Sequence, residues 1–189
     1  TPDYFTNSGF KNNMNLYFKN LNSVGKKDQS YGSSPSIKGM GLFEISSSLP
    51  LVKNNDLSKE ILIPKISFRA NPVNDMIDYS SSSKVINADN VFAINRLGLS
   101  DTFEQGKSIT LGIDYKFDIN SNIVEQNELL DKFLEIKLAT VLRDSLEEKI
   151  PKKSTINQKS SNIFGSINNN LLENINLKYD FSLDNNLKT

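Results

Sequence analysis

The sequence contains no cysteine, no histidine and no tryptophan. Without cysteine there is no disulfide framework and no thiolate metal site. Without histidine, the commonest general base and the commonest neutral metal ligand are missing. A Ser-His-Asp or Cys-His mechanism cannot be built from this chain alone. We therefore expect no catalytic residue, no metal site and no cofactor, and we do not expect an enzyme.

Two further absences concern charge and long hydrophobic runs. Lys plus Arg is 22 and Asp plus Glu is 22, so no basic excess indicates binding to nucleic acid. No stretch approaches the roughly 18 apolar residues of a membrane helix. This excludes helical spans but not barrel strands, whose signal is about ten alternating residues. Hydrophobic residues make up 37%, which is thin for a soluble two-layer core.

What the sequence does contain is alternation with a period of two. In "SITLGIDYKFDI", residues 108–119, the odd-numbered positions are apolar and the even-numbered positions are small, polar or charged. Strict alternation gives a strand with one apolar and one polar side. Twelve residues exceed the usual strand of five or six, and the span 109–119 matches the 9–11 residues with which a tilted strand crosses a bilayer.

The same pattern recurs along the chain. Eight segments are candidate strands: 13–23, 39–52, 60–72, 85–98, 108–119, 132–144, 161–169 and 174–184. We therefore predict an all-β fold, an antiparallel meander of about eight long strands.

One segment also fits a helix. Over 127–149, Leu130, Leu134, Leu138 and Leu142 lie four residues apart. We favour a strand over 132–144, because the neighbouring segments are strands and its apolar residues also alternate with charged or small ones.

The connections come in two lengths. Residues 171–174 predict a tight turn, whereas 24–36, 73–85 and 147–160 are long and polar. Short turns on one side and long loops on the other are typical of an outer-membrane barrel, although the long segments fit disordered inserts in a soluble sheet as well.

Two environments suit such strands. In a soluble sandwich the apolar side packs on a second sheet; in a barrel it meets lipid while the polar side lines the lumen. We favour an arc of a large transmembrane β-barrel. Its inward residues would include Thr110, Asp114, Lys116, Asn176, Lys178 and Asp180, and its lipid-facing residues Leu111, Ile113, Leu177 and Tyr179.

Residues 86–117 carry a more specific pattern. It consists of an aspartate, an aromatic residue, Asn-Arg, a glycine, two acidic residues and a strand that opens with Thr-Leu-Gly. These are Asp89, Phe92, Asn95, Arg96, Gly98, Asp101, Glu104, Thr110, Leu111 and Gly112. The run resembles the barrel domain of the lipopolysaccharide-assembly proteins of the outer membrane, the LptD/OstA family.

The resemblance implies transport without covalent chemistry, in the outer membrane of a Gram-negative bacterium. The implied partners are lipopolysaccharide, a plug lipoprotein in the barrel lumen, and outer-membrane lipid. Residues 1–189 would then be an internal part of the barrel domain, with the jelly-roll domain and the remaining strands outside them. The alternatives are another outer-membrane barrel, such as a porin or a receptor-type transporter, and a soluble carbohydrate-binding or adhesive β domain.

The polar residues of this run have two interpretations. Asn95, Arg96, Asp101 and Glu104 either contact a substrate or plug, or form a structural network of ion pairs and hydrogen bonds, which we favour because an Arg fork suits carboxylates. Gly98 and Gly112 indicate either close backbone approach or, as we expect, a kink or bulge in the barrel wall.

Overall fold

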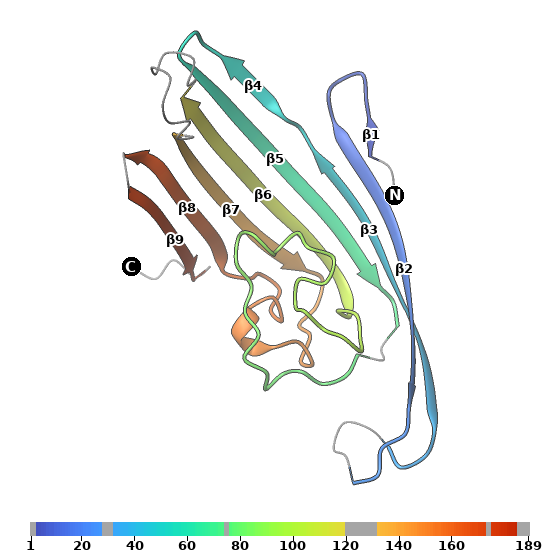
Figure 1. The fold of residues 1–189 in the computed structure, drawn as a ribbon. Helices are drawn as coiled ribbons and strands as arrows, with labels where there is room; N and C mark the ends of the chain where they lie inside the picture. The colour runs from blue at the N-terminus through green and yellow to red at the C-terminus, as the bar shows by residue number, and fades with distance from the viewer. Residues whose placement is uncertain (1–2, 28–31, 74–75, 120–131, 173–174, 185–189) are drawn as a thin grey trace, which may run out of the picture.

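The fold was analysed in a computed structural model, which describes residues 3–27, 32–73, 76–119, 132–172 and 175–184. Long strands dominate it (Figure 1). Their bounds are β1 Tyr4–Phe5, β2 Lys11–Ser23, β3 Ser36–Ser48, β4 Leu51–Asn54, β5 Ser58–Asn71, β6 Gly106–Ile119, β7 Phe133–Arg143, β8 Ile163–Leu172 and β9 Ile175–Leu183. A short 3-10 helix, Lys152–Ser154, interrupts the connection between β7 and β8.

The strands form one antiparallel sheet in the order β1-β2-β3-β5-β6-β7-β8-β9, with β4 paired to β5. Each long strand pairs with its neighbour in the chain, and the sheet stays open at both edges (Figure 1). The predicted all-β meander is therefore confirmed. An open sheet of this kind is consistent with an arc of a barrel wall.

Pro50 and Pro64 mark an irregularity in the sheet. The predicted strand 39–52 is divided into β3 and β4, which pair one after the other with successive parts of the same strand, β5. The carbonyl of Pro64 accepts a hydrogen bond from the Leu49 amide at 3.1 Å, so this edge of Pro64 faces the β3–β4 junction. Proline removes one donor from the ladder, and here the missing donor falls where the ladder is already broken.

The two sides of the sheet differ in what covers them. On β6, Ile109, Leu111 and Ile113 are each 39% exposed, whereas Ser108 and Thr110 are buried. The side of Leu111 and Ile113 is called the outer face below, and the side of Thr110 is called the inner face.

Two long connections lie over the inner face (Figure 1). The first insert comprises residues 72–73 and 76–105 between β5 and β6, and the second insert comprises residues 144–162 between β7 and β8. They share a small hydrophobic core with the inner side chains of β7 and β8. Its buried members are Met76, Ile86, Ala88, Val91, Leu97, Leu99, Ala139, Val141, Ile150, Ile156 and Phe164.

The prediction of a strand over 85–98 is wrong. No strand forms over these residues, which lie in the first insert and contain turns at 88–92 and 94–97. The Asn87 side chain accepts hydrogen bonds from the amides of Asp89 and Asn90 at 3.1 and 3.0 Å. Asparagine favours such local turns over a strand ladder. The apolar residues that imitated a strand instead supply the core beneath the insert.

For 132–144 the strand prediction is confirmed, because β7 occupies Phe133–Arg143. Part of the helical alternative, 127–131, lies outside the described residues, as do 28–31 of the long connection 24–36 and 173–174 of the predicted turn. None of the helices in the described ranges is long and apolar enough to cross a membrane.

Candidate functional site: a network beneath the first insert

The centre of the inner face is a buried ion pair. Arg96 Nη2 lies 2.5 Å from Glu104 Oε1, and Arg96 Nε donates to Glu104 Oε2 at 2.7 Å. The guanidinium also donates to Thr110 Oγ1 at 2.9 Å and to Ser108 Oγ at 3.0 Å, both on β6. One arginine from the first insert thus holds its own loop together and fastens it to the strand that follows.

A second arginine approaches the same carboxylate from β7. Arg143 pairs with Glu104 and donates to the backbone carbonyl of Gln105. The side chains of Arg96 and Arg143 are 1% and 0% exposed and that of Glu104 is 10% exposed. Charges buried to this degree require partners, and here two guanidinium groups enclose one carboxylate.

This arrangement determines the protonation state of Glu104. Burial alone would raise the pKa of the carboxyl, but Arg96, followed by Arg143 and Arg69, lowers the pKa to about 2. Glu104 is therefore ionised at neutral pH. It binds the arginines as a carboxylate and does not act as a proton donor.

A third arginine fixes the insert from β5. Arg69 Nη2 donates to the backbone carbonyls of Phe92 and Ala93 at 3.0 and 2.8 Å. Its Nε lies 2.8 Å from Glu44 Oε2 on β3, and both side chains are buried. Arg69 therefore joins two strands and the first insert at one point.

Three other residues of the predicted pattern shape the insert itself. Asn95 both donates to the Leu99 carbonyl and accepts from the Leu99 amide at 2.8 Å. Gly98 lies inside this loop with φ of 60°, a conformation that glycine adopts without strain. Asp101 accepts a hydrogen bond from Tyr79 Oη at 2.6 Å, which ties the two ends of the insert together.

Asp89, near the middle of the first insert, binds two lysines of the wall. Lys137 Nζ on β7 lies 2.9 Å from one carboxylate oxygen, and Lys178 Nζ on β9 lies 2.8 Å from the other. The hydrogen bonds from Lys137 and Lys178 lower the pKa of Asp89 from 3.8 to about 2. Asp89 therefore links β7 and β9, which are not neighbours in the sheet.

Phe92 and Gly112 meet at a close approach. A Cβ atom added to Gly112 would lie 2.6 Å from the Phe92 ring, and Lys65 Nζ lies 4.6 Å from the ring centroid. The ladder runs through Gly112 without a register shift on either side. The expected kink or bulge at Gly112 is therefore wrong, and the alternative of close approach is correct. Leu111, the neighbour of Gly112, points to the outer face.

The structure therefore brings nine of the ten predicted residues to the inner face or into the first insert: Asp89, Phe92, Asn95, Arg96, Gly98, Asp101, Glu104, Thr110 and Gly112. Of the four polar residues in the favoured interpretation, Arg96 and Glu104 form an ion pair with each other, whereas Asn95 and Asp101 hydrogen-bond to Leu99 and Tyr79. No nucleophile is paired with a base in it. Within the described ranges, no group of three or more acidic residues is placed to hold a metal ion.

Sequence reasoning missed four strand residues that bind the first insert, namely Glu44, Arg69, Lys137 and Arg143. It predicted that Lys178 faces inward, but it did not predict the pairing with Asp89. Each of these residues occupies a polar position of an alternating segment, and this position in the pattern indicates that its side chain faces inward. The signal did not show which polar positions meet the insert, because this depends on the register between strands.

The long-stranded antiparallel meander, with an apolar outer face and a polar inner face fastened to inserts, is the class of sheet that builds outer-membrane barrel walls. The model of the LptD family, LPS transport system D, matches residues 19–189, and the chain belongs to this family. No curated protein matched the chain.

Membership of the family gives the biological setting. LptD proteins are outer-membrane proteins of Gram-negative bacteria, and they act in LPS transport and outer-membrane assembly without catalysing a reaction. The family handles LPS in partnership with the plug protein LptE.

Proposed function

We propose that this chain forms part of the wall of the LPS-translocating barrel, with its outer face against lipid and its inner face toward the lumen. The observation that carries the proposal is the difference between the two faces. Outward side chains such as Phe18, Ile37 and Leu177 are apolar and 80%, 80% and 58% exposed, whereas the inner face buries arginines and carboxylates.

The inner face also suggests the role of the inserts. Arg69, Arg96, Arg143 and Asp89 fix the first insert at four points. An insert fixed in this way narrows the lumen at the end of the barrel where the long loops lie, and gives LPS and the plug protein a defined surface. The residues of the network are thus positioning residues for the wall and not a transport site.

The test uses single cysteines, since this part of the chain has none. Ile113→Cys and Asp114→Cys are placed in the full-length protein, in a background without other cysteines, and the protein is inserted in a bilayer. We expect a fluorophore at position 113 to be quenched by spin-labelled lipid, and the thiol at position 114 to react with a water-soluble maleimide.

Leu177→Cys and Asn176→Cys repeat the comparison on β9, where both positions are exposed. Equal lipid quenching at both members of each pair would contradict the proposed orientation and, with it, the assignment of the inner face to the lumen.

A further inference from the structure

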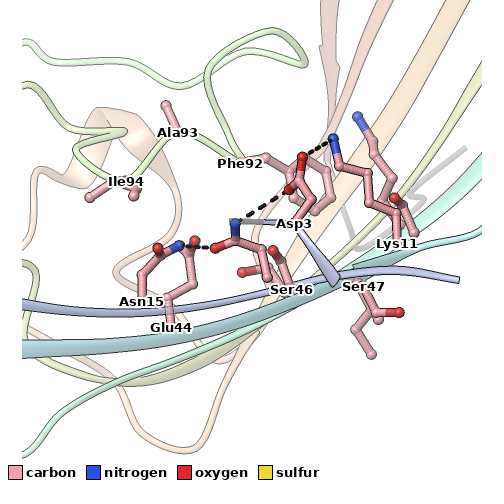
Figure 2. A pocket seen from close by; sticks show the side chains of 14 residues that line it. Asp3, Lys11, Asn15, Glu44, Ser46, Ser47, Phe92, Ala93 and Ile94 are labelled. Atoms are coloured by element: carbon pink, nitrogen blue, oxygen red, sulfur yellow. Dashed lines mark hydrogen bonds and ion pairs between the residues drawn. The ribbon is translucent and has the colours of Figure 1, made fainter. Parts of the chain in front are cut away.

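Charged side chains are distributed unequally between the two faces of the sheet. On the inner face they are frequent and have partners within the chain, and Figure 2 shows Lys11 of β2 joined to Asp3 in the cavity beneath the first insert. On the outer face, the described strand residues include three charged ones, namely Lys53 on β4, Glu60 on β5 and Lys107 on β6. Because a charge facing hydrocarbon is costly, these positions indicate where the outer face meets something else.

Two of the three charges lie side by side, at the end of the sheet away from the inserts (Figure 1). Lys53 lies opposite Glu60, and Glu60 lies opposite Phe117. Phe117 is four residues beyond Ile113 on β6, which is about 14 Å along a strand and about 10 Å of depth at the usual barrel tilt. The apolar band of such barrels is about 25 Å tall. With Ile113 near the midplane, the two charges therefore lie near the edge of the band, at the level of lipid headgroups.

The pair of Lys53 and Glu60 can make further bonds. Lys53 Nζ lies 3.2 Å from Glu60 Oε1, and Tyr115 Oη donates to Glu60 Oε2 at 3.3 Å. An ammonium has three donors and a carboxylate about four acceptor sites, so these contacts occupy one donor and two acceptor sites. The side chains of Lys53 and Glu60 are 69% and 30% exposed. A ligand can therefore reach a cation and an anion that lie next to each other.

A hollow of about 330 Å³ adjoins this pair on the outer face. Leu51 and Leu62 line it together with Lys53, Glu60 and Tyr115. Leu51, Leu62 and Tyr115 form the next row toward Ile113, so the apolar part of the hollow lies toward the bilayer centre and the charged part toward the water. A phospholipid has its acyl chains and its headgroup arranged in the same order.

We propose that the hollow binds a zwitterionic phospholipid whose headgroup carries a phosphate and a primary ammonium. Lys53 donates to the phosphate, Glu60 accepts from the ammonium, and an acyl chain lies over Leu51 and Leu62. A quaternary ammonium has no N–H group to donate to Glu60, and a glycerol headgroup places no cation beside the carboxylate. The inference rests on the proposed function in one respect, that the outer face meets lipid.

The test measures which lipid lies next to the hollow. Ile119→Cys carries a fluorophore in the full-length protein in its complex with LptE, in a background without other cysteines, because Ile119 is 40% exposed and follows Phe117 on the outer face. The vesicles contain equal amounts of phosphatidylethanolamine and phosphatidylcholine with the same acyl chains. One lipid or the other is spin-labelled, and the two degrees of quenching give the relative binding constant.

At position 119 we expect phosphatidylethanolamine to bind about twofold to fivefold more tightly than phosphatidylcholine, the equivalent of one exposed ion pair. Leu177→Cys is the matched position, because Leu177 lies in the row of Phe117 but on β9, away from the pair. There the two lipids should bind equally.

Three variants assign the effect to its residues. Glu60→Gln keeps the size of the side chain and an acceptor for Tyr115, and it should abolish the preference for phosphatidylethanolamine at position 119. Lys53→Met should lower the preference for phosphatidylcholine over the diacylglycerol that lacks the phosphate. Lys107→Met removes the outward charge at the opposite end of β6 and should change neither ratio.

Equal binding of the two lipids at position 119, the same preference at position 177, or a preference that survives Glu60→Gln would overturn the headgroup site. A preference for phosphatidylglycerol over both zwitterionic lipids would also overturn it, since Lys53 would then act alone. If the cysteines at 113 and 114 behave as proposed but position 119 shows no preference, only the headgroup site is lost; if those cysteines fail, the outer face itself is misassigned.

Discussion

The outer and inner faces of the same strands differ in the polarity and the burial of their side chains. On the outer face of β6, apolar side chains such as Leu111 and Ile113 remain 39% exposed. On the inner face, the polar side chains of Ser108 and Thr110 are buried against the first insert. A soluble domain places its apolar residues inside and its polar residues outside; these side chains of β6 show the opposite order.

This difference between the faces shows which side chains of the strands determine where the inserts are fixed. In the proposed orientation the outer face meets lipid, which is a uniform neighbour, so that face needs only apolar surface of sufficient length. The inner face has to fix two irregular inserts, and it does so with directional groups, of which arginine is the most specific. The polar side chains of the strands therefore determine where the inserts are fixed to the wall.

The largest expected effect tests the inner face. Arg96→Ala leaves Glu104 with Arg143 alone and removes the donors to Ser108 and Thr110. Loss of one partner from a buried ionic network costs about 3–5 kcal/mol. We expect much less folded protein in the outer membrane, measured by the fraction of heat-modifiable barrel.

Lys84→Ala is the control for Arg96→Ala, because this half-buried lysine of the same insert donates to the Gly98 carbonyl and belongs to no ion pair among the described residues. Its effect should be within about 0.5 kcal/mol. LPS delivery per folded molecule should be unchanged in Arg96→Ala. A variant that folds normally but stalls LPS release would show that the network acts in transport.

The next effect tests the outer face. Ile113→Lys places a charge toward lipid and should destabilise the barrel by about 2–4 kcal/mol if position 113 lies near the bilayer midplane. Asp114→Asn is the inner-face control, because it keeps the size of the side chain and loses only the partly exposed pair with Lys65. Denaturant titrations of both variants in lipid vesicles measure the difference, and similar free energies of unfolding would refute the contrast between the faces.

A smaller effect tests the close approach on the inner face. Gly112→Ala puts a methyl group against the Phe92 ring, and overpacking of this kind costs about 1–3 kcal/mol. Phe92→Ala should relieve the added strain, so the double variant should be more stable than the sum of the two single effects predicts. Strict additivity in this double-mutant cycle would place the ring elsewhere.

The smallest effect concerns pH. The pKa of Asp89 is about 2 in the folded protein against an ordinary 3.8, so its contribution is complete above about pH 4 and is lost as the pH falls toward 2. The side chain is 35% exposed, and solvent screening limits the contribution to below about 1 kcal/mol. Asp89→Asn should be slightly less stable than the unmodified protein at pH 7 and equal to it near pH 2, by denaturant titration.

The strands could be predicted from the sequence because alternation is a local property. Residues 108–119 show it without interruption, and β6 occupies Gly106–Ile119. Alternation was also sufficient to choose a strand for 132–144, although leucines four residues apart fit a helix.

The inserts could not be predicted in the same way, because their apolar residues are organised by contacts between distant segments. Ile86 and Val91 in the first insert pack in one core with Ile150 and Ile156 in the second. Read locally, the first pair imitated a strand, and the second pair lay in a stretch that looked only polar. The resemblance to the family located the motif residues, but their partners depend on strand register.

The bridge made by Asp89 has a consequence for the order in which the wall assembles. Its lysine partners follow it in the sequence by 48 and 89 residues, so the first insert cannot complete its contacts while β9 is missing. Distant contacts of this kind slow folding. The contact between Asp89 and Lys178 therefore forms only once β9 lies beside β8, whereas the contacts of the insert with β5, β6 and β7 need no residue of β9.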